Sequence, residues 1–290
     1  MKCSISNEYL TLTVDSLGAQ MLSICSTDGC EYLWQGDSRY WKDRAPNLFP
    51  VIGRLTDNCC KINGKVYPMG IHGFAAASEF ACTKKTNDKL VLSLTANEKT
   101  KTQYPFDFVF SIAYVLKEKT VAITYKVENR SDSTMPFGIG GHPGFQVPLI
   151  EGENFGDYYL EFDRECHPDR IGFTPKVYLS GVDESYPLED RRLSLQHSLF
   201  DEDAIILKNM ARTVSLRSRK SGRGVTVSYP NMPYVGFWHR PKTNAPYVCI
   251  EPWYGLPARQ DVVEELTCKS DLVQLPSGKT YENEWTITIF

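Results

Sequence analysis

Short runs in which apolar and polar residues alternate recur along almost the whole chain. Leu10, Leu12 and Val14 alternate with polar residues, which is the pattern of a strand with one buried face. The pattern predicts many short strands with few residues between them. Further β-prone runs of this kind occupy residues 90–94, 108–116, 120–128, 158–162, 204–207, 213–216, 224–228, 234–238, 247–250 and 285–289.

Two turn signals indicate how some of these runs connect. Asn63-Gly64 lies at the centre of the β-prone stretch 60–67, and this dipeptide favours a type I′ hairpin because both turn residues need positive φ. The next three runs, between residues 90 and 128, predict a meander with Lys117-Glu118 at one of its turns. Both signals predict antiparallel pairing between neighbours in sequence.

Helical periodicity is scarce. Residues 260–266 predict one or two helical turns and residues 38–42 a shorter one. The stretch 163–200 is rich in Pro, Gly, Asp and Glu and predicts long loops. Many antiparallel strands with few short helices indicate an all-β sandwich or barrel. Because no internal repeat or linker-like stretch occurs, we expect a single domain over residues 1–290.

Composition narrows the class of protein. A chain of 290 residues with 42% hydrophobic residues can bury roughly 75% of the surface that its unfolded form exposes, so its core needs no disulfide or metal. The formal net charge is −3, and neither a basic run nor a cluster of arginine with aromatic residues occurs. Nucleic acid is therefore not an expected partner.

The N-terminus and the cysteines indicate a cytoplasmic protein. The opening MKCSISNEYLTLTV lacks the apolar core of a signal peptide, and no stretch approaches 18 consecutive apolar residues. We therefore expect neither secretion nor a membrane span. Nine cysteines occur at irregular spacing without a CxxC pair, which gives no support to structural zinc or a redox dithiol.

Four short segments combine glycine or proline with ionisable and aromatic residues, and the first two carry Arg54 and His72. NLFPVIGRL, at 47–55, has Arg54 directly after a glycine, and the planar guanidinium of this arginine suits a polar ligand. A surface arginine or one paired for structural reasons is the alternative. GIHGF, at 70–74, places a histidine beside glycine and an aromatic residue, either at a pocket rim or as a structural histidine.

The other two segments carry His142 and Glu251. In GIGGHPGF, at 138–145, glycines allow close approach of the backbone to a ligand around a side chain that titrates near neutral pH. In YVCIEPWYG, at 247–255, an apolar strand leads into a carboxylate and a Pro-aromatic turn. The ring of Trp253 beside that carboxylate suits a sugar, and a salt-bridged glutamate at a strand end is the alternative. Trp238 is expected to pack in the core rather than to stack on a ligand.

Taken in order, these segments resemble the aldose 1-epimerase (galactose mutarotase-like) superfamily, and within it the bacterial subgroup related to LacX. LGAQ at 17–20 followed by EYLW at 31–34 is similar to the N-terminal strands of that subgroup. NLFPVIGR, HGF, GGHPGF and IEPWYG then follow in the family's order. The likeness extends over about residues 5–290. It implies a galactose mutarotase-like β-supersandwich that binds a small aldose sugar in an open cleft.

The resemblance also implies roles for individual residues. His142, in a GHP motif, matches the family's catalytic acid, and Glu251 matches its catalytic base. Arg54 and His72 match a supporting arginine and a second histidine.

Part of the family's pattern is matched less closely. The family's hydroxyl-binding aspartate matches Asp203 in DEDAII, with Asp201 close enough to compete for that match. The motif around His72 is shorter than in the better-known galactose mutarotases, and a different turn follows Glu251. The resemblance therefore implies the class of reaction more closely than the identity of the sugar.

The reaction that the resemblance implies is the interconversion of α and β anomers of a hexose. It needs a proton on the ring oxygen and removal of a proton from the C1 hydroxyl, so one acid and one base suffice without metal or redox cofactor. His142 and Glu251 are the residues expected to supply them.

Three alternatives stay open. A hexose-6-phosphate mutarotase would need a cationic group for the phosphate, for which Arg54, Arg44 or Arg240 are the candidates. A glycoside hydrolase would need two carboxylates flanking the scissile bond. A non-catalytic carbohydrate-binding protein would share the fold without the activity. Unphosphorylated aldoses are favoured because no arginine cluster occurs, and no oligomeric state is predicted.

Overall fold

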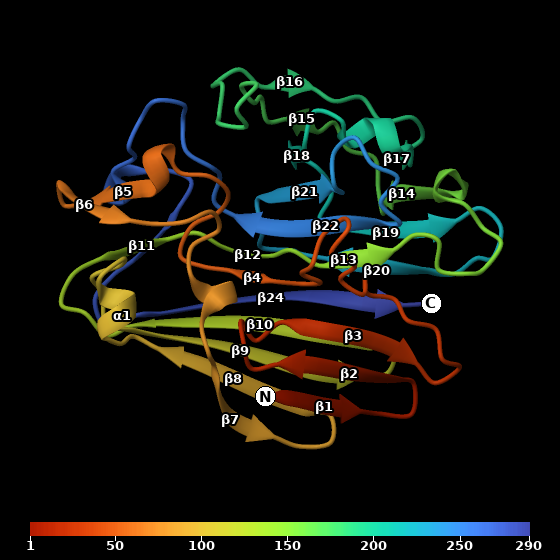
Figure 1. Ribbon diagram of the computed structural model, residues 1–290, viewed down its shortest axis with the longest axis horizontal. Coiled ribbons are helices and arrows are strands. Elements are labelled where there is room, and N and C mark those ends of the chain that lie inside the picture. The colour runs from red at the N-terminus through yellow and green to blue at the C-terminus, as the bar shows by residue number, and fades with distance from the viewer.

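Antiparallel strands build most of the molecule in the computed structural model, which describes residues 1–290 (Figure 1). The larger of two main sheets has nine strands. Its order is β17 (Arg192–Ser194), β14 (Tyr158–Phe162), β19 (Thr213–Ser218), β20 (Gly224–Ser228), β24 (Thr280–Ile289), β10 (Thr120–Asn129), β9 (Phe108–Lys117), β8 (Lys89–Thr95) and β7 (Ala81–Lys85).

The second main sheet has eight strands and packs against the first, with β22, β12 and β4 above β24, β10 and β9 in Figure 1. Its order is β16 (Glu184–Ser185), β15 (Asp169–Arg170), β18 (Ile205–Lys208), β21 (Tyr234–Trp238), β22 (Tyr247–Tyr254), β12 (Ile139–Gly141) and β4 (Asn47–Leu48), with β13 (Gly144–Gln146) also paired to β22.

Smaller elements complete the chain. The smaller sheets join β1 (Lys2–Ser6), β2 (Leu10–Asp15) and β3 (Met21–Ser26); β5 (Cys59–Ile62) and β6 (Lys65–Pro68); and β11 (Met135–Phe137) and β23 (Val273–Leu275). The helical segments are α1 (Glu98–Lys101) and the 3₁₀ turns η1 (Thr56–Asn58), η2 (Ala75–Ala77), η3 (Phe155–Asp157), η4 (His197–Phe200) and η5 (Leu266–Cys268). No helix is long and apolar enough to cross a membrane.

The antiparallel all-β architecture with few short helices confirms the predicted fold class. Asn63 and Gly64 have φ of 51° and 77° between β5 and β6, as the type I′ hairpin requires. Strands β8, β9 and β10 form the predicted meander, and Glu118, with φ of 50°, lies in its second turn.

Of the two predicted helical segments, residues 38–42 form a single turn and residues 260–266 do not form the predicted helix. Residues 38–42 contain a turn in which the carbonyl of Asp37 accepts the N–H groups of Tyr40 and Trp41, and the helix does not continue. In 260–266 the chain turns at Asp261, whose φ of 60° is incompatible with a helix, and it has no helical structure from there until η5 begins at Leu266. The predicted loop stretch 163–200 is mostly irregular but includes β15, β16, β17 and η4.

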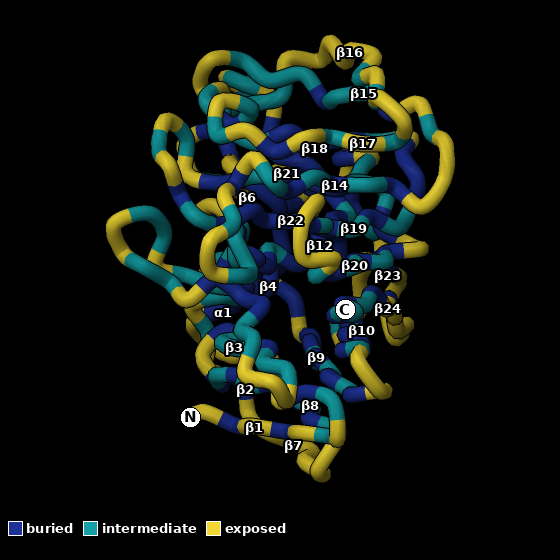
Figure 2. Tube along the Cα trace, turned by 90° about the vertical axis from the view of Figure 1, so that its right-hand side faces the viewer, coloured by how far each residue is buried: buried dark blue, intermediate teal, exposed yellow.

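The interface between the two main sheets positions the segment that follows β12. The Tyr125 hydroxyl on β10 donates to the Asn47 side chain on β4 at 2.8 Å, a buried link between the sheets. The ring of Trp285 on β24 lies so close to Gly141 that a Cβ there would be 2.5 Å from it. Glycine therefore allows the end of β12 to lie directly on the opposite sheet. Figure 2 shows the buried residues through the interior and the exposed ones mainly in peripheral loops.

Candidate active site

A cleft of about 590 Å³ opens over β22 and brings together every residue that the sequence motifs singled out for a site. Its ionisable and tryptophan lining residues are Trp41, Asp43, Arg54, His72, His142, Asp203, Trp238, Arg240, Glu251 and Trp253. These residues come from distant parts of the chain. The cleft is therefore a product of strand pairing rather than of any one segment.

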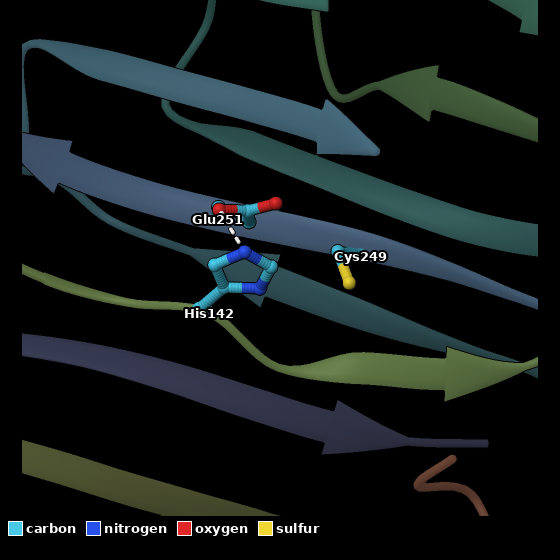
Figure 3. A group of neighbouring side chains, drawn as sticks. All are labelled: His142, Cys249 and Glu251. Carbon is cyan, nitrogen blue, oxygen red and sulfur yellow. Dashed lines mark ion pairs between the residues drawn. The ribbon is translucent and has the colours of Figure 1, made fainter. Parts of the chain in front are cut away.

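His142 and Glu251 occupy facing positions on adjacent strand segments. Gly140 of β12 pairs with Trp253 of β22, and Gly144 of β13 pairs with Cys249 of the same strand. His142, midway between the two glycines, therefore lies opposite Glu251, midway between Trp253 and Cys249. Figure 3 shows the resulting contact, in which His142 Nε2 lies 3.2 Å from Glu251 Oε2.

The structure places Glu251 inside β22 rather than at a strand end, because β22 continues to Tyr254. Its side chain is 1% exposed. The facing residue on β21 is Gly236, which brings no side chain against the carboxylate. Glu251 Oε2 has no hydrogen-bond partner, since its approach to His142 lies outside hydrogen-bond geometry. This carboxylate is buried without the bonds that usually compensate burial.

Burial shifts both members of the pair toward their neutral forms. It raises the pKa of Glu251 well above its ordinary value, and the negative charge of Asp203 adds to the shift. It lowers the pKa of His142 well below its ordinary value, with a further contribution from His72. A protonated carboxyl beside a neutral imidazole holds the same single proton as a carboxylate beside an imidazolium. The two forms differ only by transfer of a proton between the residues.

His72 has a fixed tautomer. The backbone N–H of Gly53 donates to His72 Nδ1 at 3.1 Å, so the ring proton lies on Nε2. Burial, assisted by the charge of Arg54, lowers the pKa of His72 to about 4. A neutral ring whose Nδ1 is occupied leaves the Nε2 N–H as a hydrogen-bond donor in the cleft. The two ring centroids of His72 and His142 are 5.5 Å apart.

Glycine maintains the turn that carries His72. Gly73 has a φ of 76°, and a Cβ there would be 2.3 Å from the carbonyl oxygen of Phe49. That carbonyl accepts the N–H groups of Phe74 and Ala75. The HGF motif is therefore tied to the NLFPVIGR segment by close backbone contact.

Two arginines line the cleft without an ionic partner. Arg54 and Arg240 are exposed and have no carboxylate within 4.0 Å. Arg44, the third arginine considered from sequence, lies outside the cleft lining and donates to the Leu22 carbonyl and the Gln35 side chain. Arg44 therefore has a structural role, and the other two remain available to a ligand.

The structure distinguishes between the two candidate aspartates. Asp203 lines the cleft, and its Oδ1 accepts the N–H of Ala204 at 2.8 Å, which orients the carboxylate. Asp201 accepts the backbone N–H of Lys242 at 3.2 Å and is absent from the cleft lining.

Three tryptophans line the cleft. The ring centroid of Trp41 lies 4.9 Å from that of His142, and the Trp238 ring stands edge-on to both at 5.6 Å. Trp238, expected in the core, is half-buried and lines the cleft. Trp253 is buried, and its Nε1 has no hydrogen-bond partner. Sequence reasoning missed Trp41, which lies in the short turn at 38–42, where no motif marks it.

Cys249 completes the group drawn in Figure 3, with its sulfur and one atom of each of His142 and Glu251 within 4.8 Å of one another. These are the types of atom that ligate zinc. Burial and the neighbouring Glu251 charge raise the pKa of the thiol well above its ordinary value.

The sequence model of the aldose 1-epimerase family matches residues 1–264. The chain belongs to the aldose 1-epimerase family. It is 34% identical to the plasmid-encoded protein LacX of Lactococcus lactis subsp. lactis, over 100% of this chain and 99% of that protein.

Two solved structures from lactobacilli show the same galactose mutarotase-like fold. A galactose mutarotase related enzyme from Lactobacillus acidophilus superposes with a TM-score of 0.95 and 35% identity, covering 100% of this chain and 97% of that one. A galactose mutarotase-like protein from Lactobacillus casei superposes with a TM-score of 0.93 and 28% identity, covering 100% of both chains. The family membership that the motifs implied is thereby confirmed.

Proposed function

We propose that this member of the aldose 1-epimerase family is a mutarotase that interconverts the α and β anomers of a hexose. The observation that carries the proposal is the contact between His142 and Glu251, an acid and a base 3.2 Å apart in a cleft of sugar-binding character. Anomer interconversion needs one proton donor and one proton acceptor close to C1 and the ring oxygen.

The reaction proceeds by opening and closing the sugar ring. The Glu251 carboxylate accepts the proton of the C1 hydroxyl while the His142 imidazolium donates a proton to the ring oxygen, and the bond between C1 and the ring oxygen breaks. Rotation about the C1–C2 bond presents the other face of the aldehyde. The ring closes by the reverse transfers, so no proton is gained or lost overall.

The buried setting of the pair favours transfer in both directions. Attraction between opposite charges stabilises the carboxylate–imidazolium form, which exists before ring opening. Burial stabilises the neutral form of Glu251 and His142, which exists while the sugar is open. The opposing effects bring the two forms closer in free energy, as a reversible proton shuttle requires.

The remaining cleft residues suit the hydroxyl groups of the sugar. His72 offers its Nε2 N–H, Arg54 offers guanidinium N–H groups, and Asp203 offers carboxylate oxygens. The aromatic faces of Trp41 and Trp253 suit the C–H faces of the ring. The lining therefore combines donors, acceptors and stacking surfaces in one cleft.

A phosphorylated hexose is the second candidate substrate, because Arg54 and Arg240 both line the cleft without ionic partners. Asp43 and Asp203 line it too and oppose an anion. Comparison of kcat/KM for glucose and glucose 6-phosphate decides between them. The phosphorylated hexose would be favoured by a kcat/KM that is higher for glucose 6-phosphate than for glucose. Arg54→Gln and Arg240→Gln should then abolish this difference.

The proposal is tested by following the anomers of freshly dissolved α-glucose and α-galactose by polarimetry or NMR. We expect the wild type to accelerate their equilibration and a folded Glu251→Gln variant to lose the effect. If neither the free sugars nor their 6-phosphates respond, while calorimetry detects sugar binding, the protein is a carbohydrate-binding protein without turnover.

A further inference from the structure

Cys249 lies next to the proton-transfer pair without lining the proposed sugar cleft. It precedes Glu251 by two residues on β22, so the two side chains point to the same face of the strand. Cys249 is fully buried, whereas the side chain of His142 is 11% exposed and lines the cleft. The proton transfers proposed above make no use of the thiol, which is therefore available for another role.

The three side chains have the geometry of a metal site with three protein ligands. The Cys249 sulfur, one ring nitrogen of His142 and one carboxylate oxygen of Glu251 all lie within 4.8 Å of one another (Figure 3). A nitrogen and an oxygen that each bind one tetrahedral zinc at about 2.0 Å are about 3.3 Å apart. The distance from His142 Nε2 to Glu251 Oε2 is 3.2 Å. The pair is therefore spaced as two zinc ligands are.

Buried polar atoms at this point have no hydrogen-bond partners. Glu251 Oε2 and His142 Nδ1 are both buried without one. A buried carboxylate oxygen is costly unless a donor or a cation compensates it. The unpaired oxygen therefore points to a ligand. A sugar hydroxyl from the cleft is one such ligand, and a cation shared with Cys249 is another.

The types of ligand atom select the class of cation. Thiolate together with imidazole and carboxylate suits zinc and similar thiophilic ions, whereas magnesium and calcium prefer oxygen ligands alone. The rest of the cleft lining carries equal numbers of carboxylates and guanidinium groups, namely Asp43 and Asp203 against Arg54 and Arg240. The affinity for a cation must therefore come from the three ligand atoms rather than from the charge of the cleft.

We propose that Cys249, His142 and Glu251 bind one zinc ion or a similar thiophilic divalent cation, and that the bound cation inhibits the enzyme. The inference rests on the mutarotase function proposed above and concerns the regulation of the same site. The cation enters from the cleft, and its fourth coordination position stays open to water or a sugar hydroxyl. It occupies the lone pairs through which His142 and Glu251 move protons, so ring opening stops.

Binding exchanges protons for the cation. The pair holds one proton and the Cys249 thiol holds a second, and both leave because metals bind the thiolate, the carboxylate and the neutral imidazole. Two positive charges leave as protons and two arrive with the cation, so the net charge of the buried group does not change. Calorimetry in buffers of different ionisation enthalpy is expected to report about two protons released for each cation bound.

The test measures zinc inhibition in the wild type, Cys249→Ala and Cys3→Ala. Zinc is expected to slow anomer equilibration by the wild type, and magnesium at the same concentration is not. For Cys249→Ala, measured against its own zinc-free rate, the inhibition constant should rise at least about tenfold, since even residues behind a ligand contribute about 10–100-fold to metal affinity. Cys3, a buried cysteine on β1 outside the cleft, is the matched control and should keep the wild-type inhibition constant.

Cobalt gives a readout that does not depend on turnover. Bound Co²⁺ is expected to show near-ultraviolet thiolate-to-cobalt absorption in the wild type and Cys3→Ala, with a component that Cys249→Ala lacks. Cys249→Ser keeps the size of the side chain without a thiolate, and it serves as the second variant if alanine destabilises the protein.

Three results would overturn the metal site. They are a wild type that binds no zinc, an inhibition constant equal in the wild type and Cys249→Ala, and a cobalt spectrum unchanged by the substitution. Failure of the mutarotase function is a separate result, in which no sugar is turned over. Calorimetric titration with zinc then still tests the site, because binding weakened in Cys249→Ala supports it and equal binding rejects it.

Discussion

His142 and Glu251 face each other across adjacent strand segments, with Nε2 and Oε2 3.2 Å apart. The strand pairings on both sides of the contact fix it, so neither side chain depends on a flexible loop. A base and an acid held in one register are expected to act as a unit.

Substituting His142 and Glu251 singly and together tests whether they act as a unit. We expect Glu251→Gln and His142→Asn each to lower kcat by about 10²–10⁴-fold, because each removes one proton-transfer group. The double variant should lose little more than either single variant, since one missing partner already prevents the coupled transfer. Rates by polarimetry and folding by circular dichroism provide the measurement. Glu282→Gln, exposed on β24, is the control. A kcat loss in the double variant equal to the product of the two single losses would show that His142 and Glu251 act independently.

The buried carboxyl of Glu251 is expected to reduce stability at neutral pH. Because its pKa is raised in the native state, the Glu251 carboxyl binds more protons in the native protein than in the unfolded chain, and its own contribution to stability falls as pH rises from about 4.5 toward the native pKa. Glu251→Gln removes this dependence. The Tm of the variant should therefore exceed that of the wild type, by a margin that widens between pH 5 and pH 8.

Glu264 provides the control of opposite sign. Burial opposes its ionisation, but hydrogen bonds from Arg259 outweigh burial and lower its pKa. Its contribution to stability is present at neutral pH and disappears as pH falls below about 4.5. Glu264→Gln should therefore lower the Tm at pH 7 and do so less at pH 4. The same sign of effect for both glutamates would refute this account.

His72 is expected to act as a neutral hydrogen-bond donor. His72→Asn should lower kcat/KM about fivefold, the effect of about one lost hydrogen bond. Because the pKa of His72 is about 4, the shape of the pH–rate profile between pH 5 and pH 8 should not change. A shifted or missing limb in that range would show that His72 titrates during the reaction.

The turn at Gly73 is expected to tolerate no side chain. Gly73→Ala should destabilise the protein by about 2 kcal/mol or more, because an added Cβ meets the Phe49 carbonyl at 2.3 Å. Gly64→Ala is the matched control. It has nearly the same φ, 77° against 76°, but no atom within 4 Å of an added Cβ, so it isolates backbone strain of about 1 kcal/mol. Equal losses in thermal unfolding would exclude the clash.

Trp41 is expected to contribute stacking rather than proton transfer. Trp41→Ala should raise KM about fivefold to tenfold with a smaller effect on kcat, consistent with aromatic contacts worth about 1 kcal/mol. Trp41→Phe keeps an aromatic face and should restore most of the affinity. If kcat falls as much as kcat/KM in both variants, Trp41 acts by orienting His142, whose ring centroid lies 4.9 Å away.

Local patterns in the sequence were sufficient to predict the all-β fold class. Alternation of apolar and polar residues predicted strands such as β2, β9 and β10, and Asn63-Gly64 predicted its hairpin, because side-chain period and turn φ are properties of a few adjacent residues. The helix predicted at 260–266 was wrong because that prediction also used only a few adjacent residues. Its apolar spacing resembles a helix, but hydrogen bonds between Arg259 and Glu264 hold it in another conformation.

The sequence by itself also marked His142, Glu251, Arg54 and His72, since glycine and proline around ionisable residues are visible locally. Tertiary structure alone decided that His142 lies opposite Glu251, that Asp203 rather than Asp201 lines the cleft, and that Trp41 joins it. These relations depend on pairing and packing between segments distant in sequence. The free energy that stabilises these contacts comes from many residues throughout the core. A local sequence pattern therefore does not show which residues come into contact.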